Sequence, residues 1–169
     1  LIPGSTIAFV REMKDQKVLD WIKKIDATTQ RTVSVCTGSI ILAATGLLTG
    51  KKATSHWKPI GLLAQFGVAP TRERIVDEGK YITAAGVSAG LDMAIYLINQ
   101  LKGEKAAKAA QLSIEYDPDP MFRSGNYLTA EKDIIKLSEQ TMEKDARKDF
   151  TLWEMLKNAR TLLKLKMNA

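Results

Sequence analysis

Cys36 is the single cysteine of this chain, and its setting is typical of a reactive thiol. It follows a β-type run at residues 32–35 and precedes Thr37, Gly38 and an apolar helical stretch at 40–44. A strand, a tight turn and a helix in this order form a nucleophile elbow. The helix dipole and free N–H groups at such a turn favour the thiolate. The pattern predicts a cysteine nucleophile. A buried, inert thiol is the alternative, because free cysteines are often buried.

His56 is the only histidine, and it lies on a short extended segment after the elbow helix. An imidazole beside Cys36 could hold the thiolate or move its proton. It could equally be a half-buried structural histidine at the turn before Trp57, since histidine often serves both roles. The sequence leaves both interpretations open.

Ser88 lies in a second motif, Gly86-Val87-Ser88-Ala89-Gly90, which has the form G-x-S-x-G. In a serine hydrolase of this type the acid and the histidine follow the serine. Here the only histidine precedes Ser88, so no base is available downstream. We interpret the motif as a tight glycine turn in which Ser88 caps the next helix. Asp92, on that helix, is interpreted as a hydrogen-bonding group.

Metal and cofactor sites are not indicated by the sequence. One histidine and one cysteine do not make a zinc site, and no carboxylate cluster has ligand spacing. Neither a Walker loop nor a G-x-G-x-x-G turn follows a strand. We therefore expect chemistry that uses no metal and no cofactor.

The composition is that of an ordinary soluble domain: 169 residues, 45% hydrophobic and 26% charged. The net charge of +6 is spread along the chain, which indicates a solvated surface rather than a nucleic-acid site. No apolar run is long enough to span a bilayer, so no membrane partner is expected. A lone cysteine fits a reducing compartment and favours a cytoplasmic location.

Strand and helix patterns alternate along the first two thirds of the chain. Strands are predicted at 32–35, 72–77 and 81–85, and helices at 14–24, 40–48, 57–66, 87–101 and 104–114. This alternation predicts an α/β sandwich with a largely parallel sheet. Ligands of such sheets bind beyond the carboxyl ends of the strands, where Cys36 and the turn Pro3-Gly4-Ser5 are expected.

Five segments together resemble the ThiJ/PfpI superfamily, whose members are similar to class I glutamine amidotransferases. They are Pro3-Gly4-Ser5, Val35-Cys36-Thr37-Gly38-Ser39, and residues 44–57, 85–94 and 114–118. The resemblance covers residues 1 to about 126 and is greatest for the isonitrile hydratase branch. It implies a flavodoxin-like three-layer α/β sandwich, usually a homodimer, that acts on a small molecule without a cofactor.

The resemblance also implies roles for individual residues. Cys36 would be the nucleophile, with Thr37 and His56 beside it in the catalytic group. Backbone N–H groups of Thr37 and of the Gly4-Ser5 turn would bind an oxyanion, and Gly86 would lie at the substrate. The family has an acidic residue, Asp or Glu, on a first strand and helix that would precede Leu1, so we expect a missing or separate N-terminal segment.

Residues 1–128 are accordingly expected to form the α/β domain without its first strand and helix. Residues 129–169 are expected to form a helical extension with two apolar patterns: Ile134 and Leu137 in the first, Trp153, Leu156 and Leu163 in the second.

The implied activity is that of an isonitrile hydratase, which converts an isonitrile into an N-substituted formamide. Two alternatives stay open. One is another cysteine activity of the superfamily, of the glyoxalase or peptidase kind. The other is a ligand-sensing domain related to AraC-type regulators, although the tail is too short for their DNA-binding module.

Overall fold

The fold centres on a three-stranded mixed sheet with the strand order β1–β5–β4. The computed structural model describes residues 1–148, 158, 159, 161 and 163. β1 (Thr32–Val35) runs parallel to β5 (Tyr81–Ala84), and β4 (Ile75–Glu78) forms an antiparallel hairpin with β5. The strands predicted from sequence are therefore present, with the hairpin as the antiparallel part of the sheet.

Two further strand pairings are short, and the first agrees with the interpretation of Leu1 and Ile2 as the end of a strand. Ile2 forms a parallel bridge with Ser34, so the N-terminal residues extend the sheet beside β1. β2 (Lys52–Ala53) and β3 (Ala69–Pro70) form a separate parallel pair of two residues each. The strands β2 and β3 have too few residues to show a periodicity, so their pairing was not predicted.

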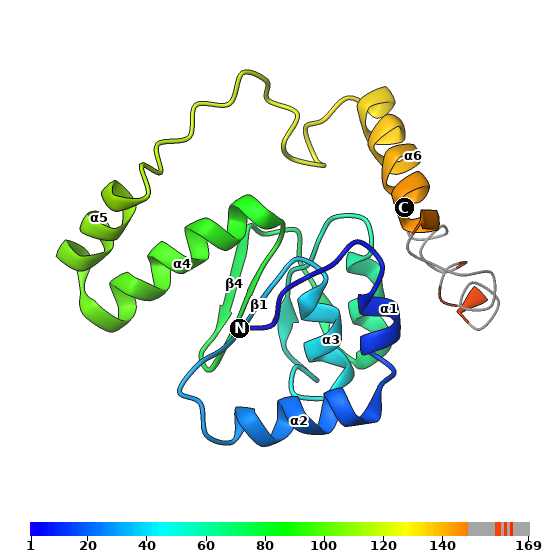
Figure 1. The fold of residues 1–169 in the computed structure, drawn as a ribbon, viewed down its shortest axis with the longest axis horizontal. Helices are drawn as coiled ribbons and strands as arrows, with labels where there is room; N and C mark the ends of the chain where they lie inside the picture. Colours follow the sequence, from blue (N-terminus) through cyan, green and yellow to red (C-terminus); the bar gives the residue numbers. More distant parts are fainter. Residues whose placement is uncertain (149–157, 160, 162, 164–169) are drawn as a thin grey trace.

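Helices cover both faces of the central sheet. α4 (Val87–Lys102) packs on Val33 and Ile82, whereas Tyr81, the neighbour of Ile82, contacts the larger core that contains α3 (Gly38–Ala44). Neighbouring residues of a strand point to opposite faces, so both faces are buried. The remaining helices are α1 (Phe9–Glu12), α2 (Gln16–Asp26), the 3₁₀ helix η1 (Ile60–Phe66), α5 (Glu104–Ser113) and α6 (Lys132–Lys148). Figure 1 shows α1, α2 and α3 on one side of the strands and α4 with α5 on the other.

The helices predicted before residue 129 are all present among the described residues, with corrections in type and extent. The segment predicted as a helix at 57–66 is the 3₁₀ helix η1, which ends at Gly67 with φ +70°. α1 was not predicted, because four residues are too few to show a helical period. α6 matches the first apolar pattern of the tail. In the second pattern, Trp153 and Leu156 lie outside the described residues.

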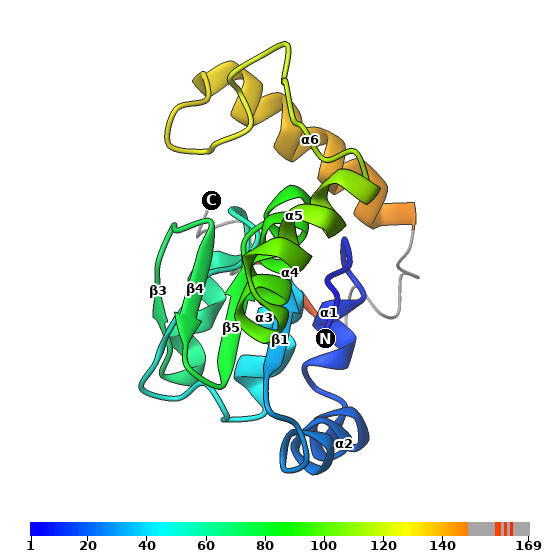
Figure 2. The same ribbon diagram turned by 90° about the vertical axis from the view of Figure 1, so that its left-hand side faces the viewer.

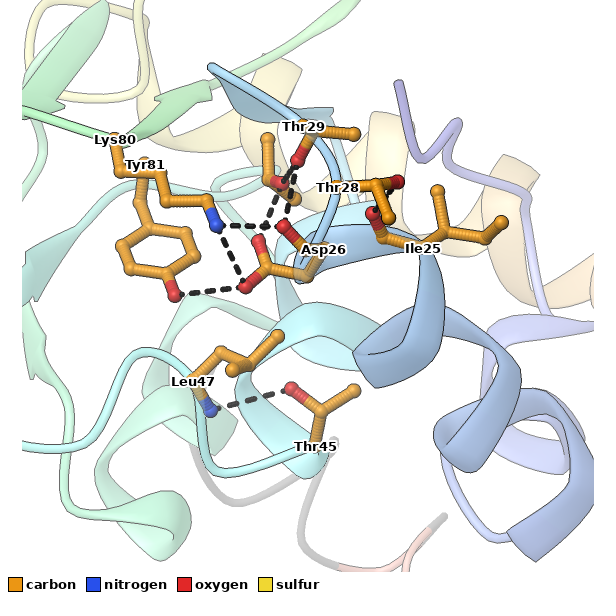
Figure 3. A network of polar contacts seen from close by, with 9 residues as sticks. Ile25, Asp26, Thr28, Thr29, Thr45, Leu47, Lys80 and Tyr81 are labelled. Carbon is orange, nitrogen blue, oxygen red and sulfur yellow. Dashed lines mark hydrogen bonds and ion pairs between the residues drawn. The ribbon is translucent and has the colours of Figure 1, made fainter.

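Buried Asp26, the last residue of α2, joins the helix to the sheet through a polar network (Figure 3). Its carboxylate accepts hydrogen bonds from the Thr32 hydroxyl at 2.5 Å and the Tyr81 hydroxyl at 3.2 Å. Lys80 Nζ lies 3.1 Å from the carboxylate and donates to the Asp26 carbonyl at 2.6 Å. The network therefore fixes the start of β1, the strand that leads to Cys36.

An extended connection carries the chain from α5 to α6, over the top of the molecule in Figure 1 and above α4 and α5 in Figure 2. Tyr127 in this connection stacks on Trp57 with ring centroids 5.2 Å apart. The Arg72 guanidinium lies 4.2 Å from the centroid of the Tyr127 ring. These contacts tie the connection to the segment that follows His56. None of the described helices is long and apolar enough to cross a membrane.

Candidate active site

Cys36 lies at the end of β1 in a left-handed backbone conformation, with φ +59°. Its N–H still continues the sheet by donating to the carbonyl of Ala84 at 3.0 Å. Thr37 then turns the chain into α3, which begins at Gly38. A positive φ is costly for a residue with a side chain, and such residues are frequent at functional sites.

Gly4 and Gly38 allow the N-terminal turn to press against Cys36. A Cβ atom on Gly4 would lie 2.6 Å from the Cys36 Cβ and 2.8 Å from the Thr37 nitrogen. A Cβ atom on Gly38 would overlap the Ile2 carbonyl oxygen and lie 2.8 Å from that of Pro3. Only glycine fits at both positions, because the two backbones would otherwise be forced apart.

Thr37 and Ser5 form a reciprocal pair of hydrogen bonds. The Thr37 hydroxyl accepts from the Ser5 N–H at 2.8 Å and donates to the Ser5 carbonyl at 2.9 Å. The Ser5 hydroxyl in turn accepts from the Phe9 N–H at 2.8 Å, at the start of α1. The Ser5 N–H, expected from the resemblance to bind an oxyanion, is therefore engaged by Thr37 in this structure.

Two serine hydroxyls converge on the carbonyl oxygen of Cys36. Ser39 and Ser55 each donate to it at 3.0 Å. Both serines are buried. The segment that carries Ser55 is tied to the sheet, because the Thr54 N–H donates to the Thr83 hydroxyl at 3.0 Å. Contacts from two separate segments thus hold the peptide that follows the thiol.

The pKa of the Cys36 thiol is raised. Burial is the main cause, and hydrogen bonding from the backbone and side chain of Thr37 offsets it only in part. The helix-terminus argument therefore predicted the wrong direction for the net shift, since it neglected the loss of solvation at the base of the turn. The raised pKa favours the neutral thiol, so a reaction at Cys36 would require a group that takes up the thiol proton.

His56 lies on the wall of the same cavity as Cys36. Its Nδ1 accepts from the Lys58 N–H at 3.4 Å, and its ring lies 5.4 Å from that of Trp57. Burial lowers the pKa of the imidazole, and the nearby charge of Lys58 lowers it further. Among the described hydrogen bonds and ion pairs, none joins His56 to the Cys36 sulfur. His56 is therefore a neutral imidazole on the cavity wall.

The cavity in front of Cys36 has a volume of about 1180 Å³. The turn at residues 3–7 contributes to it, together with Cys36, Thr37 and His56. Helices α4 and α6 supply a large apolar part of the remaining lining, namely Val87, Leu91, Met93, Ala94, Leu97, Met142 and Ala146. A mostly apolar cavity with a few polar groups at one place is the usual form of a small-molecule site.

Lys58 and Glu143 are charged residues of the cavity wall that the sequence analysis did not identify. Lys58 Nζ lies 3.4 Å from Glu143 Oε1, and the Lys58 side chain is only 13% exposed. Lys58 stands two residues after His56 and could have been noticed for that reason. Glu143 lies on α6, far along the chain, and nothing in the sequence relates it to Cys36. Among the described residues, no three His, Cys, Asp or Glu side chains gather where they could hold a metal ion.

The second glycine motif does not contribute a catalytic serine to the cavity. Gly86 precedes α4 and does not line the cavity, in contrast to the sequence-based expectation, whereas Val87 and Gly90 do. Ser88 does not cap the helix as predicted, because its hydroxyl accepts from Arg74 at 3.2 Å instead. Arg74 also pairs with Asp92, confirming that this carboxylate is a hydrogen-bonding group.

Comparisons with known proteins relate the chain to enzymes and to regulators. An isonitrile hydratase from Pseudomonas putida is 42% identical over 123 residues, covering 73% of this chain and 54% of that protein. The HTH-type transcriptional regulator CdhR from Pseudomonas aeruginosa is 34% identical over 92 residues, covering 53% of this chain and 27% of the regulator. The chain thus spans about half the length of the first relative and a quarter of the second.

The fold and the family follow from two further comparisons. The crystal structure of a THiJ/PfpI family protein from Pseudomonas syringae matches with a TM-score of 0.75 and 39% identity, covering 85% of this chain and 61% of that chain. This match confirms the predicted flavodoxin-like α/β fold. The family model described as DJ-1/PfpI family matches residues 1–100. A sequence match over more than half of its length and a shared fold show that the chain belongs to the DJ-1/PfpI family.

Proposed function

We propose that this chain carries the catalytic centre of an isonitrile hydratase-like hydro-lyase, with Cys36 as the nucleophile. The observation that carries the proposal is the single cysteine, held at φ +59° at the edge of a largely apolar cavity. The likeness to the Pseudomonas putida isonitrile hydratase, 42% identity over 73% of this chain, supports the proposal.

The proposed reaction adds water to an isonitrile in two steps. The Cys36 sulfur bonds to the terminal isonitrile carbon, and the thiol proton is transferred to the same carbon, which gives a thioimidate. Water then adds to this carbon and the C–S bond breaks. One water proton goes to nitrogen and the other returns to the sulfur, which releases the N-substituted formamide. The atoms and electrons of these two steps balance without a metal or a redox cofactor.

The proton transfers require a group beside Cys36 that is unprotonated at rest. His56 has a lowered pKa and can take the thiol proton and return it to the isonitrile carbon. The acidic residue implied by the resemblance, on a segment before Leu1, is the other candidate for this transfer. Thr37 and the Gly4-Ser5 turn would orient the polar intermediate, since the turn packs against the Cys36 Cβ and is hydrogen-bonded to Thr37.

The proposal extends to the organisation of the protein. Residues 1–128 would form the catalytic domain and 129–169 an extension that supplies part of the cavity wall, as Met142 and Ala146 do. We propose a cytoplasmic homodimer that acts on a small molecule. The homodimer is supported by several large apolar side chains that are exposed to solvent in the single chain and could be covered by a second copy. Among them are Leu112, Met121 and Phe122.

The test is incubation of the purified chain with cyclohexyl isocyanide. The expected result is release of N-cyclohexylformamide, with a transient mass increase of one isonitrile on the chain. The Cys36→Ala variant should show neither signal, and Cys36→Ser serves as the isosteric control. Formamide production no faster than in the Cys36→Ala control would overturn the proposal.

A ligand-sensing role is the second candidate, because the chain is also similar to a transcriptional regulator. In that case isonitriles or other small apolar molecules would bind the cavity in a saturable way without turnover. Calorimetric titration beside the formamide assay separates the two functions.

A further inference from the structure

Cys36 shares its cavity with an apolar surface contributed by two helices that are distant in sequence. We call this surface the α4–α6 wall: Leu91, Ala94 and Leu97 from α4, and Met142 and Ala146 from α6. Leu91 keeps 42% of its surface exposed. A ligand that covers this wall would remove apolar area from water, which is the main source of affinity for such surfaces.

The size of the cavity exceeds what a small reactant needs. Its volume of about 1180 Å³ lies above the range of roughly 300–1000 Å³ that suits drug-sized ligands. The small side chains of Ala94 on α4 and Ala146 on α6 both border this space. The cavity therefore has room for a substituent larger than a cyclohexyl ring.

Among the described residues that line the cavity, the charged side chains are those of Lys58 and Glu143. Lys58 and Glu143 are paired with each other at 3.4 Å. Cys36 and His56 both have pKa values shifted toward their neutral forms, mainly by burial. A carboxylate or ammonium group on a ligand would lose hydration here and find no unpaired charged side chain among the described lining residues.

We infer that this site selects neutral molecules that combine a small reactive head at Cys36 with a bulky apolar substituent on the α4–α6 wall. The inference rests on the proposed function for the identity of the head group, but the selectivity is a property of the cavity. Each methylene group buried on the wall should raise kcat/KM about fourfold until the space is filled.

The first experiment measures the cavity without any turnover, using alkylation of the single thiol. The reagents are N-methylmaleimide, N-cyclohexylmaleimide and the charged 3-maleimidopropionic acid. For each reagent, the relative rate is its alkylation rate with the folded chain divided by its rate with the same chain unfolded in urea. The cyclohexyl reagent should exceed the methyl reagent at least tenfold in this relative rate, and the carboxylate reagent should be the slowest of the three.

The second experiment follows hydration of methyl, cyclohexyl and 1-adamantyl isocyanide, with kcat/KM expected to rise along this series. Ala94→Leu and Ala146→Leu each place a larger side chain in the cavity, one from α4 and one from α6. The ratio of the cyclohexyl rate to the methyl rate should therefore fall at least fivefold in each variant, for the maleimides and for the isocyanides. Ala109→Leu is the matched control, because Ala109 lies exposed on α5 outside the cavity lining.

The outcomes separate this inference from the proposed function. Equal relative rates for the three maleimides, or a ratio unchanged in both alanine variants, would overturn the inference. Size-selective alkylation without hydration of any isonitrile would support the apolar site and refute the hydratase. Hydration that ignores substituent size would refute the inference alone.

Discussion

The Ser55 hydroxyl donates a hydrogen bond to the Cys36 carbonyl at 3.0 Å, joining the segment before His56 to the turn that holds the thiol. Ser39 donates to the same oxygen from within α3. The positive φ of Cys36 is therefore supported from outside the turn as well as from within it. Ser55 is a positioning residue, since it contacts the backbone of Cys36.

Replacing Ser55 by alanine should loosen the turn at Cys36 without changing the residues that line the cavity. We expect a loss of about 1 kcal/mol in the free energy of unfolding, the usual value for one hydrogen bond. kcat should fall several-fold at nearly constant KM, because the thiol is less well placed. Ser113→Ala is the matched control, since its hydroxyl donates to a backbone carbonyl on exposed α5. An equal change in kcat for both variants would contradict the positioning role.

Gly38→Ala should damage the centre through a backbone clash. The new methyl group would meet the carbonyl oxygens of Ile2 and Pro3, so the N-terminal segment must move away from α3. Overpacking of this kind costs about 1–3 kcal/mol, measured by urea unfolding. Gly125→Ala, where no atom lies within 4 Å, should change stability little. A Gly38→Ala variant as stable as the Gly125→Ala variant would show that the contact is absent.

Alkylation of Cys36 by iodoacetamide should depend on pH with a midpoint above that of the same thiol in the urea-unfolded chain. The physical reason is burial, which disfavours the thiolate and raises the pKa in the folded state. The folded chain then binds more protons than the unfolded one, so the free energy of unfolding falls as pH rises through the unfolded thiol's pKa. Cys36→Ala should lack this alkaline loss. A folded midpoint at or below the unfolded one would mean that the helix terminus outweighs burial.

Glu143→Gln should leave Lys58 without its partner on the cavity wall. The cavity then gains a positive charge, so iodoacetate should alkylate Cys36 several-fold faster relative to iodoacetamide than it does in the original chain. Glu104→Gln is the control, because Glu104 forms an equivalent but exposed ion pair with Lys108 on α5. A reagent ratio that stays the same in Glu143→Gln would contradict the placement of this charge.

Asp26→Asn should lower stability most strongly at neutral pH. Burial alone would raise the pKa of Asp26, but hydrogen bonds from Thr32, Lys80 and Tyr81 and the Lys80 charge outweigh it, so the pKa is lowered. The carboxylate then contributes stability above its unfolded pKa and loses it as pH falls through the folded pKa. We expect a loss of about 1–3 kcal/mol at pH 7 and a smaller difference at pH 3. An equal loss at both pH values would show that the charge itself is unimportant.

Local patterns in the sequence determined the elements that carry the centre. The run at 32–35, Thr37-Gly38 and the apolar stretch that follows were sufficient to predict the strand, the turn and the helix around Cys36. The hairpin of β4 and β5 and helices α2, α4 and α5 were also predictable, because their contacts repeat with a regular period. The pieces that were missed, α1, β2 and β3, are too short to show any period.

Only the tertiary structure decided which groups surround the thiol and how it ionises. Glu143 and Ala146 reach the cavity from α6, and Ser55 reaches the turn from a separate segment, through contacts that no sequence spacing encodes. The direction of the Cys36 pKa shift was decided in the same way. Burial depends on everything that packs around the sulfur, whereas the helix terminus next to it is visible in the sequence.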